Sequence, residues 1–273
     1  MSSVEPALPR SRALVPGLVW RGASASTNTD LVARARDLPD LAVIATDTQT
    51  AGRGRLDRAW SAPSGAALAV SVLVRLDAAA TTAGRARPAA TTSALLGWLP
   101  LLAGTAMSTA VRRLGVEGAG VKWPNDVLVD GRKLCGVLTE LTPTGVVIGA
   151  GLNTAMTAEQ RPVPTATSLR IEGVSPDGED AATLLDRALA AYLDELLGLI
   201  GLWRRATGPA ELRARVEPLL QTIGRAVRID RPGLPPLLGA AVGLDDDGSL
   251  RVQPAEGPSI AVSAGDVTHL RYE

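Results

Sequence analysis

Residues 122–138 contain the sequence Lys122-Trp123-Pro124-Asn125-Asp126-Val127-Leu128-Val129-Asp130-Gly131-Arg132-Lys133-Leu134-Cys135-Gly136-Val137-Leu138. Two apolar-rich runs flank the pair Asp130-Gly131, and both residues of such a pair can adopt the positive φ that a tight two-residue turn requires. The stretch therefore predicts a β-hairpin. Its first strand would cover residues 127–129, and its second would begin at Arg132, with Lys133 just past the turn.

Lysine is rare in this chain, which draws attention to the hairpin. The chain has 28 basic side chains, of which only Lys122 and Lys133 are lysines. Asparagine is also rare and occurs only at Asn28, Asn125 and Asn153. A lysine offers a compact, rotatable ammonium where arginine offers a planar fork, so retained lysines favour a functional role. Lysines that only keep a strand edge soluble, or chance clustering, would give the same pattern.

The composition limits the classes of protein to consider. A chain of 273 residues can form one large domain or a large and a small one, and 46% apolar residues suffice for a sizeable core. The formal net charge of zero argues against a broad basic surface for nucleic acid, although a local basic loop stays open.

The cysteine content and the hydropathy of the chain indicate its cellular compartment. The single cysteine, Cys135, cannot form an internal disulfide, which favours a reducing compartment. It lies in an apolar strand, and we expect it to be a core residue and not a nucleophile. Residues 1–16 lack the apolar run of a signal peptide, and the apolar segment 94–107 is too short to span a bilayer. We expect a cytoplasmic protein with no membrane association.

The first half of the chain alternates between predicted strands and helices. N-capping side chains from Ser26 to Thr29 predict a short helix that begins near Asn28. Apolar periodicity predicts strands over 41–47, 68–76 and 145–153 and a helix over 94–114. Residues 1–17 are expected to be a flexible tail, 81–88 a linker and 161–180 a loop.

In the second half of the chain, the predicted elements are helices up to residue 220 and short strands after it. Apolar spacing predicts a strongly amphipathic helix over 184–200 and a shorter one over 211–220. Short strands with turn signals follow over 225–230, 237–244, 250–253, 260–263 and 267–270. We therefore predict a catalytic or binding domain over 18–220 and a small C-terminal β-barrel over 221–273.

A polar segment, residues 48–60, carries three arginines among glycines and is predicted to be a loop. Glycine permits close backbone approach, and arginine can grip a phosphate or carboxylate in two places. The loop is therefore a candidate anion-binding element. A solvated or nucleic-acid-binding arginine–glycine loop would look similar.

The polar and charged residues that could bind a ligand or take part in catalysis lie in four separated segments, around Ser26, Gln49–Trp60, Lys122–Lys133 and Asn153. Neither a Ser/His/Asp or Cys/His set nor a metal-ligand spacing is present, which disfavours triad hydrolysis and zinc chemistry. The inventory is positive charge, amides, hydroxyls and one carboxylate, Asp126. Such a set suits phosphoryl or nucleotidyl transfer, in which a protein positions anions and neutralises growing charge.

Three motifs together resemble those of biotin protein ligases: Gly52-Arg53-Gly54-Arg55-Leu56-Asp57-Arg58-Ala59-Trp60, the 122–138 stretch, and Gly151-Leu152-Asn153. The resemblance covers about residues 20–270. It implies an α+β fold in which a mixed β-sheet with packed helices, like the catalytic core of class II aminoacyl-tRNA synthetases, precedes an SH3-like C-terminal β-barrel. It also implies an enzyme that joins biotin to ATP as biotinyl-5′-AMP, with Mg²⁺, and then transfers biotin to a lysine of a biotin carboxyl carrier domain of an acyl-CoA carboxylase.

The resemblance also implies site residues. Lys133 and Arg55 would be catalytic, with Lys133 bridging the biotin carboxylate and the α-phosphate, and Asp126 is the candidate for Mg²⁺. The biotin-binding set would be Ser26, Thr27, Asn28, Gln49, Gly52, Arg53, Gly54, Arg55, Trp60, Lys133 and Gly136. The ATP-binding set would be Arg55, Arg58, Trp60, Asn125, Asp126, Lys133 and Asn153.

Several alternatives stay open from the sequence. A lipoate or octanoyl ligase shares the fold, and a biotin-sensing or nucleic-acid-binding module would also use the arginine–glycine loop. Only twenty-five residues precede Ser26, too few for the N-terminal DNA-binding domain that repressors of this family carry, so DNA binding is not expected. A monomer and a homodimer fit the sequence equally well.

Overall fold

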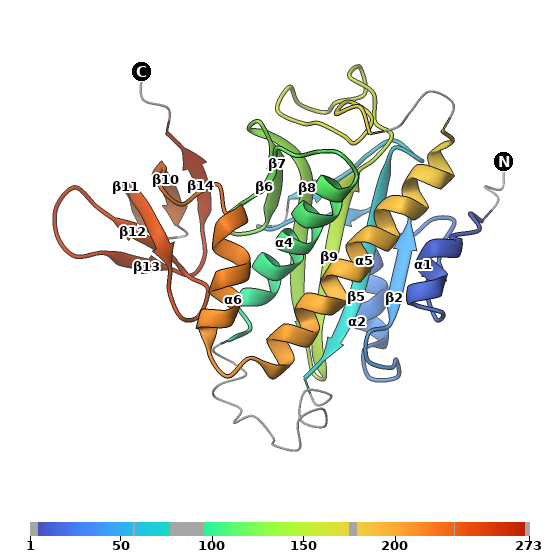
Figure 1. Ribbon diagram of the computed structural model, residues 1–273, viewed down its shortest axis with the longest axis horizontal. Coiled ribbons are helices and arrows are strands. Elements are labelled where there is room, and N and C mark those ends of the chain that lie inside the picture. The colour runs from blue at the N-terminus through green and yellow to red at the C-terminus, as the bar shows by residue number, and fades with distance from the viewer. Residues whose placement is uncertain (1–4, 57, 77–94, 175–178, 232, 271–273) are drawn as a thin grey trace.

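The computed structural model describes residues 5–56, 58–76, 95–174, 179–231 and 233–270. The linker predicted over 81–88 lies outside these residues, as does the first residue of the helix predicted over 94–114. Two β-sheets dominate the structure, a large one in the N-terminal four fifths of the chain and a small one at the C-terminal end (Figure 1).

The large sheet has seven strands in the order β1-β2-β5-β9-β8-β7-β6. Only the pairing of β1 with β2 is parallel, and the other neighbours are antiparallel, so the sheet is mixed as predicted. Its strands are β1 (Val19–Trp20), β2 (Val43–Thr46), β5 (Ala67–Arg75), β6 (Ala119–Lys122), β7 (Asp126–Val129), β8 (Arg132–Thr142) and β9 (Gly145–Asn153).

The hairpin predicted around Asp130-Gly131 is confirmed and consists of β7 and β8. Asp130 and Gly131 have φ values of 49° and 77°, the left-handed conformation that a two-residue turn with two positive φ angles needs. Lys133 is the second residue of β8, two positions past Gly131. The hairpin thus holds the rare lysine at a fixed place on the sheet.

The two faces of the sheet are covered differently. Helices α4 (Trp98–Arg113) and α5 (Ala181–Arg205) pack on one face, against Val70 and Val72 of β5 and Ile148 of β9 (Figure 1). The other face is covered over part of its area by α2 (Thr27–Arg34), through a small cluster that includes Leu31 and Val147. The area of this face that α2 leaves uncovered is where the site lies.

Two expectations about local structure are wrong. The predicted tail contains helix α1 (Pro9–Leu14), and Leu8 and Ser11 are buried. The helix is held by Asp186 of α5, which accepts hydrogen bonds from the Ser11 backbone N–H at 3.0 Å and the Ser11 hydroxyl at 2.7 Å. The predicted 48–60 loop contains a two-stranded hairpin, β3 (Gly52–Arg53) paired with β4 (Ala59–Trp60).

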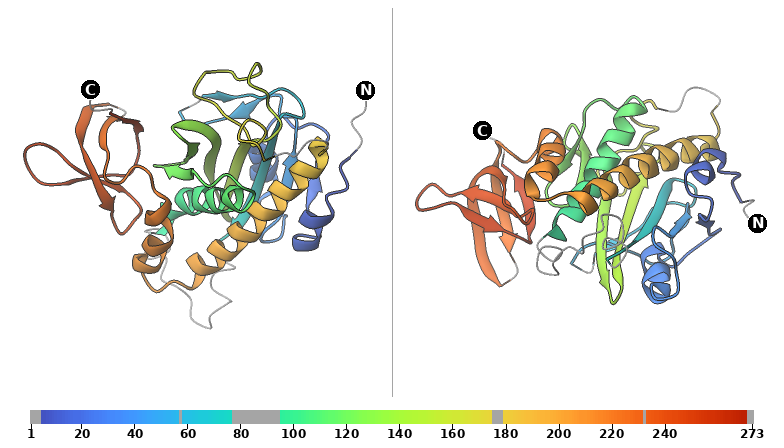
Figure 2. Two further views of the ribbon diagram at one scale, coloured as in Figure 1. Left: turned by 45° about the horizontal axis from the view of Figure 1, so that its top comes forward. Right: turned by 60° about the horizontal axis from the view of Figure 1, so that its bottom comes forward.

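The C-terminal strands form one antiparallel sheet in the order β13-β12-β11-β10-β14. This is the small SH3-like domain implied by the resemblance, and Figure 2 shows it at the end of the molecule far from the N-terminus. Its strands are β10 (Ala226–Arg231), β11 (Leu234–Leu244), β12 (Leu250–Gln253), β13 (Ile260–Val262) and β14 (Asp266–His269). Helix α6 (Pro209–Val216) and a short 3-10 turn (Glu217–Leu219) precede it.

Tryptophan side chains tie the two domains together. The indole N–H of Trp98 at the start of α4 donates to the Asp246 carbonyl at 2.9 Å, and that of Trp123 donates to the Gly248 carbonyl at 3.2 Å. The backbone N–H of Trp123 donates to the Thr222 hydroxyl at 2.9 Å. These buried bonds fix the C-terminal domain beside the 122–126 motif.

Candidate active site

The floor of the site is a set of small residues from three adjacent strands. Ala69 of β5 pairs with Gly151 of β9, which pairs in turn with Gly136 of β8. In the next row, Ser71 pairs with Gly149 and Gly149 with Leu138. Because alternate residues of a strand share a face, these small side chains leave a hollow on the face that α2 does not cover.

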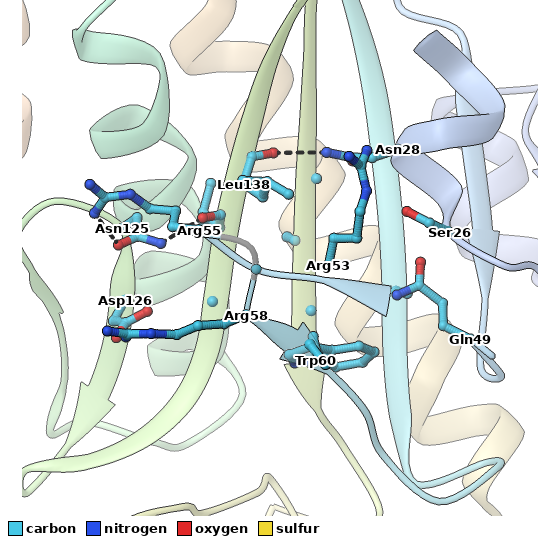
Figure 3. Close-up of a pocket in the computed structure, with 18 of the residues that line it drawn as sticks. Ser26, Asn28, Gln49, Arg53, Arg55, Arg58, Trp60, Asn125, Asp126 and Leu138 are labelled. Carbon is cyan, nitrogen blue, oxygen red and sulfur yellow. Dashed lines mark hydrogen bonds between the residues drawn. The ribbon is translucent and has the colours of Figure 1, made fainter. Parts of the chain in front are cut away.

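The hollow is a pocket, and Figure 3 shows residues of the N-terminal domain that line it. Asp266 of the C-terminal domain lines it as well. Thirteen of the residues predicted for the site line it: Ser26, Thr27, Asn28, Gln49, Arg53, Gly54, Arg55, Arg58, Trp60, Asn125, Asp126, Lys133 and Gly136. They come from the start of α2, the segment after β2, the β3–β4 hairpin, and the β7–β8 hairpin with the residue before it. The structure therefore brings together segments that are far apart in the sequence, such as Asn28 and Leu138, 110 residues apart.

One end of the pocket is polar and uncharged. Ser26 caps α2, and its hydroxyl accepts the Thr29 backbone N–H at 3.4 Å. The Gln49 carbonyl oxygen accepts the Thr27 backbone N–H at 2.8 Å, which leaves the Gln49 amide nitrogen on the side of the pocket (Figure 3). Ser26, Thr27 and Asn28 are all buried, so this end presents desolvated donors and acceptors.

The opposite end is rich in cations. Lys133 Nζ lies 2.7 Å from Asp126 Oδ1, and Arg55 donates to the Asn125 side-chain oxygen at 3.2 Å. Arg58 forms an ion pair with Asp266 of β14. Burial lowers the pKa of Arg55, and the nearby carboxylates of Asp266 and Asp126 oppose that shift. With more cations than carboxylates, this end is suited to anions.

Trp60 forms one wall of the pocket between these two ends. A Cβ at Gly151 would lie 2.8 Å from the indole carbons of Trp60, so the glycine allows the ring to approach the sheet closely. A Cβ at Gly52 would lie 2.7 Å from Gln49 Nε2. Gly52 thus allows the β3–β4 hairpin to pass over Gln49.

Two predicted residues do not line this pocket. Gly52 lies in the adjoining hollow on the outer side of the hairpin, with Arg53 and Glu140. The side-chain amide of Asn153 donates to the Thr167 carbonyl at 2.8 Å. That bond holds the segment after β9, whose Thr165 carbonyl and Thr167 N–H bond to the backbone of Lys133.

Several residues of the site were not predicted from the sequence. Asp266 comes from the C-terminal domain, and its only signal was its place between Gly265 and the short strand predicted over 267–270. Ala69, Leu138 and Gly149 line the pocket but looked like ordinary strand residues. Their contribution depends on strand register, which no local pattern gives.

Two other residues singled out from the sequence lie apart from the pocket lining. Cys135 is buried, and burial raises the pKa of its thiol to about 12, which confirms a core role. Lys122 is close to His269, whose pKa is lowered to about 4 by burial first and then by Lys122 and Arg225. His269 Nε2 lies 3.1 Å from the Thr222 hydroxyl, at the contact between the domains.

Comparison with known proteins identifies the family. Residues 23–153 match the biotin/lipoate A/B protein ligase family, and residues 222–270 match the biotin protein ligase C-terminal domain. The chain is 38% identical to a biotin–[acetyl-CoA-carboxylase] ligase of Mycobacterium tuberculosis, over 96% of this chain and 94% of that protein. The chain is a biotin protein ligase family member.

Other relatives agree with this family assignment. A bifunctional ligase/repressor BirA of Escherichia coli is 35% identical over 84% of this chain and 66% of its own length. A biotin protein ligase from Aquifex aeolicus, solved with biotin and ATP, superposes with a TM-score of 0.74 at 24% identity, over 93% of this chain and 99% of that one. At that identity the likeness concerns the fold, which it confirms as that of biotin protein ligases.

Neither a membrane-spanning helix nor a metal-binding cluster occurs among the described residues. None of the helices in that part of the chain is long and apolar enough to cross a lipid bilayer. Within the same residues, three or more His, Cys, Asp or Glu side chains do not gather in an arrangement that could hold a metal ion. Asp126, the residue predicted for Mg²⁺, is paired with Lys133 at 2.7 Å.

Proposed function

We propose that this protein activates biotin with ATP to biotinyl-5′-AMP and transfers the biotinyl group to a lysine of a biotin carboxyl carrier domain of an acyl-CoA carboxylase. The observation that carries the proposal is one pocket with an uncharged polar end and a cationic end, in a chain of the biotin protein ligase family. Biotin has the complementary ends, a ureido ring and a carboxylate.

The polar end suits the ureido ring. The ring has two N–H donors and a carbonyl acceptor. The buried residues Ser26, Thr27 and Asn28 and the half-buried Gln49 offer hydroxyl and amide partners of both kinds. The wall formed by Trp60 gives the valeryl chain an apolar surface to lie against. Desolvation makes each unmatched polar atom costly, which favours a ligand with the right pattern.

The cationic end suits the chemical step. A carboxylate oxygen of biotin attacks the α-phosphorus of ATP, the bond to the β-phosphate oxygen breaks, and pyrophosphate leaves. Lys133 is placed to release Asp126 and sit between the two anions, while Arg55 and Arg58 face the phosphates. Neutralising repulsion where charge develops is the main contribution that a protein makes to such a transfer.

Magnesium fits this site only together with the nucleotide. In phosphoryl-transfer sites, Mg²⁺ is usually bound by the substrate phosphates together with one or two carboxylates of the protein. Asp126 is the residue that would supply the protein oxygen, and the ion would add positive charge at the phosphates. Asn125, beside it, keeps Arg55 directed to this end through the 3.2 Å hydrogen bond.

In the second step, the amine of the carrier lysine attacks the acyl carbon of biotinyl-5′-AMP and AMP leaves. The adenylate is a mixed anhydride that water would hydrolyse, so a cover over the pocket is useful. The β3–β4 hairpin lies over the pocket in Figure 3 and is the element suited to this role. The partner, a carrier domain, and a cytoplasmic location rest on the sequence and on the family.

The closest competing function is lipoate ligation, because the N-terminal family model includes lipoate ligases. Lipoate ends in an apolar dithiolane ring, which cannot form strong hydrogen bonds with the polar groups at that end of the pocket. ATP–pyrophosphate exchange with biotin or with lipoate tests the proposal. We expect exchange with biotin and biotinylation of a carrier domain; exchange with lipoate alone would refute it.

A further inference from the structure

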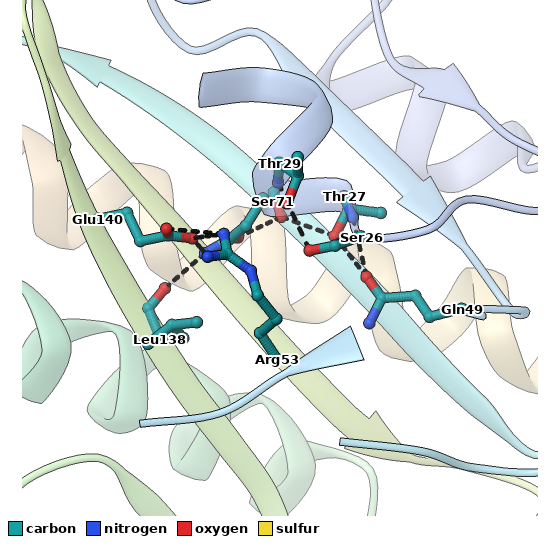
Figure 4. Close-up of polar contacts among 9 residues, drawn as sticks. Ser26, Thr27, Thr29, Gln49, Arg53, Ser71, Leu138 and Glu140 are labelled. Carbon is teal, nitrogen blue, oxygen red and sulfur yellow. Dashed lines mark hydrogen bonds and ion pairs between the residues drawn. The ribbon is translucent and has the colours of Figure 1, made fainter. Parts of the chain in front are cut away.

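Glu140 of β8 lies beside the pocket and binds two predicted pocket residues at once (Figure 4). Arg53 Nη2 of the β3–β4 hairpin lies 2.7 Å from Glu140 Oε1 and 2.8 Å from Oε2. Asn28 Nδ2 of α2 donates to Oε2 at 2.8 Å. One carboxylate on the sheet therefore links the element that covers the pocket to the helix that forms its polar end.

These bonds fix which atoms of Asn28 are available. Its amide nitrogen has two hydrogens, and they go to Glu140 and to the Leu138 carbonyl at 3.1 Å. The Ser71 hydroxyl lies 2.6 Å from Asn28 Oδ1 and, because that oxygen can only accept, donates to it. Asn28 thus has no N–H left to donate to a ligand, and only the second lone pair of Oδ1 can face one.

Ser71 extends the link to the rest of the polar end. It is fully buried, and its hydroxyl lies 2.7 Å from the Thr27 hydroxyl, next to the Thr27–Gln49 bond. Hydrogen bonds among the buried groups Thr27, Asn28 and Ser71 are rigid, because breaking one of them leaves a desolvated polar atom. The chain of bonds runs from Gln49 through these residues to Glu140 and ends at the exposed ion pair with Arg53.

We propose that Glu140 is a positioning residue that fixes Asn28 as an acceptor for the ligand and holds Arg53 of the hairpin over the pocket. The proposal deepens the proposed function, since the ligand it assigns to Asn28 is an N–H of biotin's ureido ring. An ionised carboxylate can accept from both partners, whereas the glutamine amide would turn a donor toward one of them.

The first experiment needs no ligand. Trypsin must draw Arg53 away from Glu140 to cleave the Arg53–Gly54 bond, so the cleavage rate reports how often the arginine is released. In Glu140→Gln we expect cleavage at this bond to be about fivefold faster, the range of a partly exposed ion pair. Glu195→Gln breaks a similar surface pair with Arg113, on α4, away from the pocket, and is the matched control.

The second experiment is isothermal titration of biotin without ATP. Ser71→Ala removes the donor to Asn28 Oδ1 and leaves Arg53 untouched, so we expect weaker biotin binding with an unchanged rate of tryptic cleavage at Arg53. Glu140→Gln should raise the biotin Kd about tenfold and change both readouts. Glu195→Gln should change neither.

The outcomes separate the two claims. Cleavage at Arg53 and biotin affinity in Glu140→Gln that both stay within twofold of wild type would overturn the positioning role. If the wild-type protein binds no biotin, the proposed function is refuted. The rate of tryptic cleavage at Arg53 in Glu140→Gln still decides whether Glu140 holds Arg53. Circular dichroism of each variant confirms that a change does not come from unfolding.

Discussion

Replacing Lys133 by glutamine tests the chemical core of the proposal. The ammonium lies 2.7 Å from Asp126, at the cationic end of the pocket, where it can reach the two reacting anions. A unit charge about 4 Å from another, at an effective dielectric constant near 20, contributes about 4 kcal/mol. Loss of that charge from the transition state lowers the rate about a thousandfold. We expect Lys133→Gln to reduce biotin-dependent ATP–pyrophosphate exchange by about that factor.

The same change should hardly affect folding. The Lys133 side chain is 44% exposed, and a pair of that kind contributes at most about 1 kcal/mol to the free energy of unfolding. Urea unfolding of Lys133→Gln should therefore resemble that of the wild-type protein. A large loss of stability would mean that the fall in activity has a structural cause.

Two further variants separate charge from shape. Lys133→Arg keeps the charge, but it replaces a compact ammonium that can sit between two anions with a planar guanidinium that cannot. We expect this variant to fold and to lose most exchange activity. Lys122→Gln removes the other lysine, which does not line the pocket, and is the matched control. Exchange by Lys133→Gln within tenfold of the control would remove Lys133 from the mechanism.

Three more outcomes follow from contacts outside the reacting centre. Asp266→Asn breaks the exposed ion pair with Arg58 and should raise the KM for ATP in exchange by up to about fivefold; an unchanged KM would show that the C-terminal domain does not position Arg58. Asp186→Ala leaves buried donors of α1 unpaired and should lower the free energy of unfolding by about 1–3 kcal/mol in urea; a smaller effect would mean that α1 is held by other contacts. Because the pKa of His269 is about 4 in the folded protein and near 6.5 in the unfolded chain, the unfolded state gains a proton first as the pH falls. The free energy of unfolding should therefore fall from pH 6.5 to 4, and His269→Gln should show a smaller fall; equal pH profiles would contradict this.

Local signals were enough to predict most of the fold. The Asp130-Gly131 turn, the alternation along β5 and the helical spacing in α5 each depend on residues close in sequence. Strand β5 and helix α5 also bury the residues that the sequence marks as apolar. Elements of this kind are predictable because local preference and tertiary environment agree.

Helix α1 could not be predicted in this way. A six-residue segment is too short to be a stable helix alone, and its proline, serine and arginine content is typical of a tail. It becomes helical because Asp186, 175 positions from Ser11, receives its first N–H groups. The β3–β4 hairpin is similar, because its two-residue strands depend on Glu140 and Asp266 for their position.

The location of the pocket depends on strand register, which explains why motifs alone gave only part of it. The sequence shows that Ala69 and Ser71 share one face of β5 and that Gly149 and Gly151 share one face of β9, but not that these pairs are neighbours. A shift of one residue between the two strands would turn valine and isoleucine side chains toward the hollow and fill it. The apolar residues that α4 and α5 bury fix this register, so the packing of one face of the sheet creates the binding site on the other.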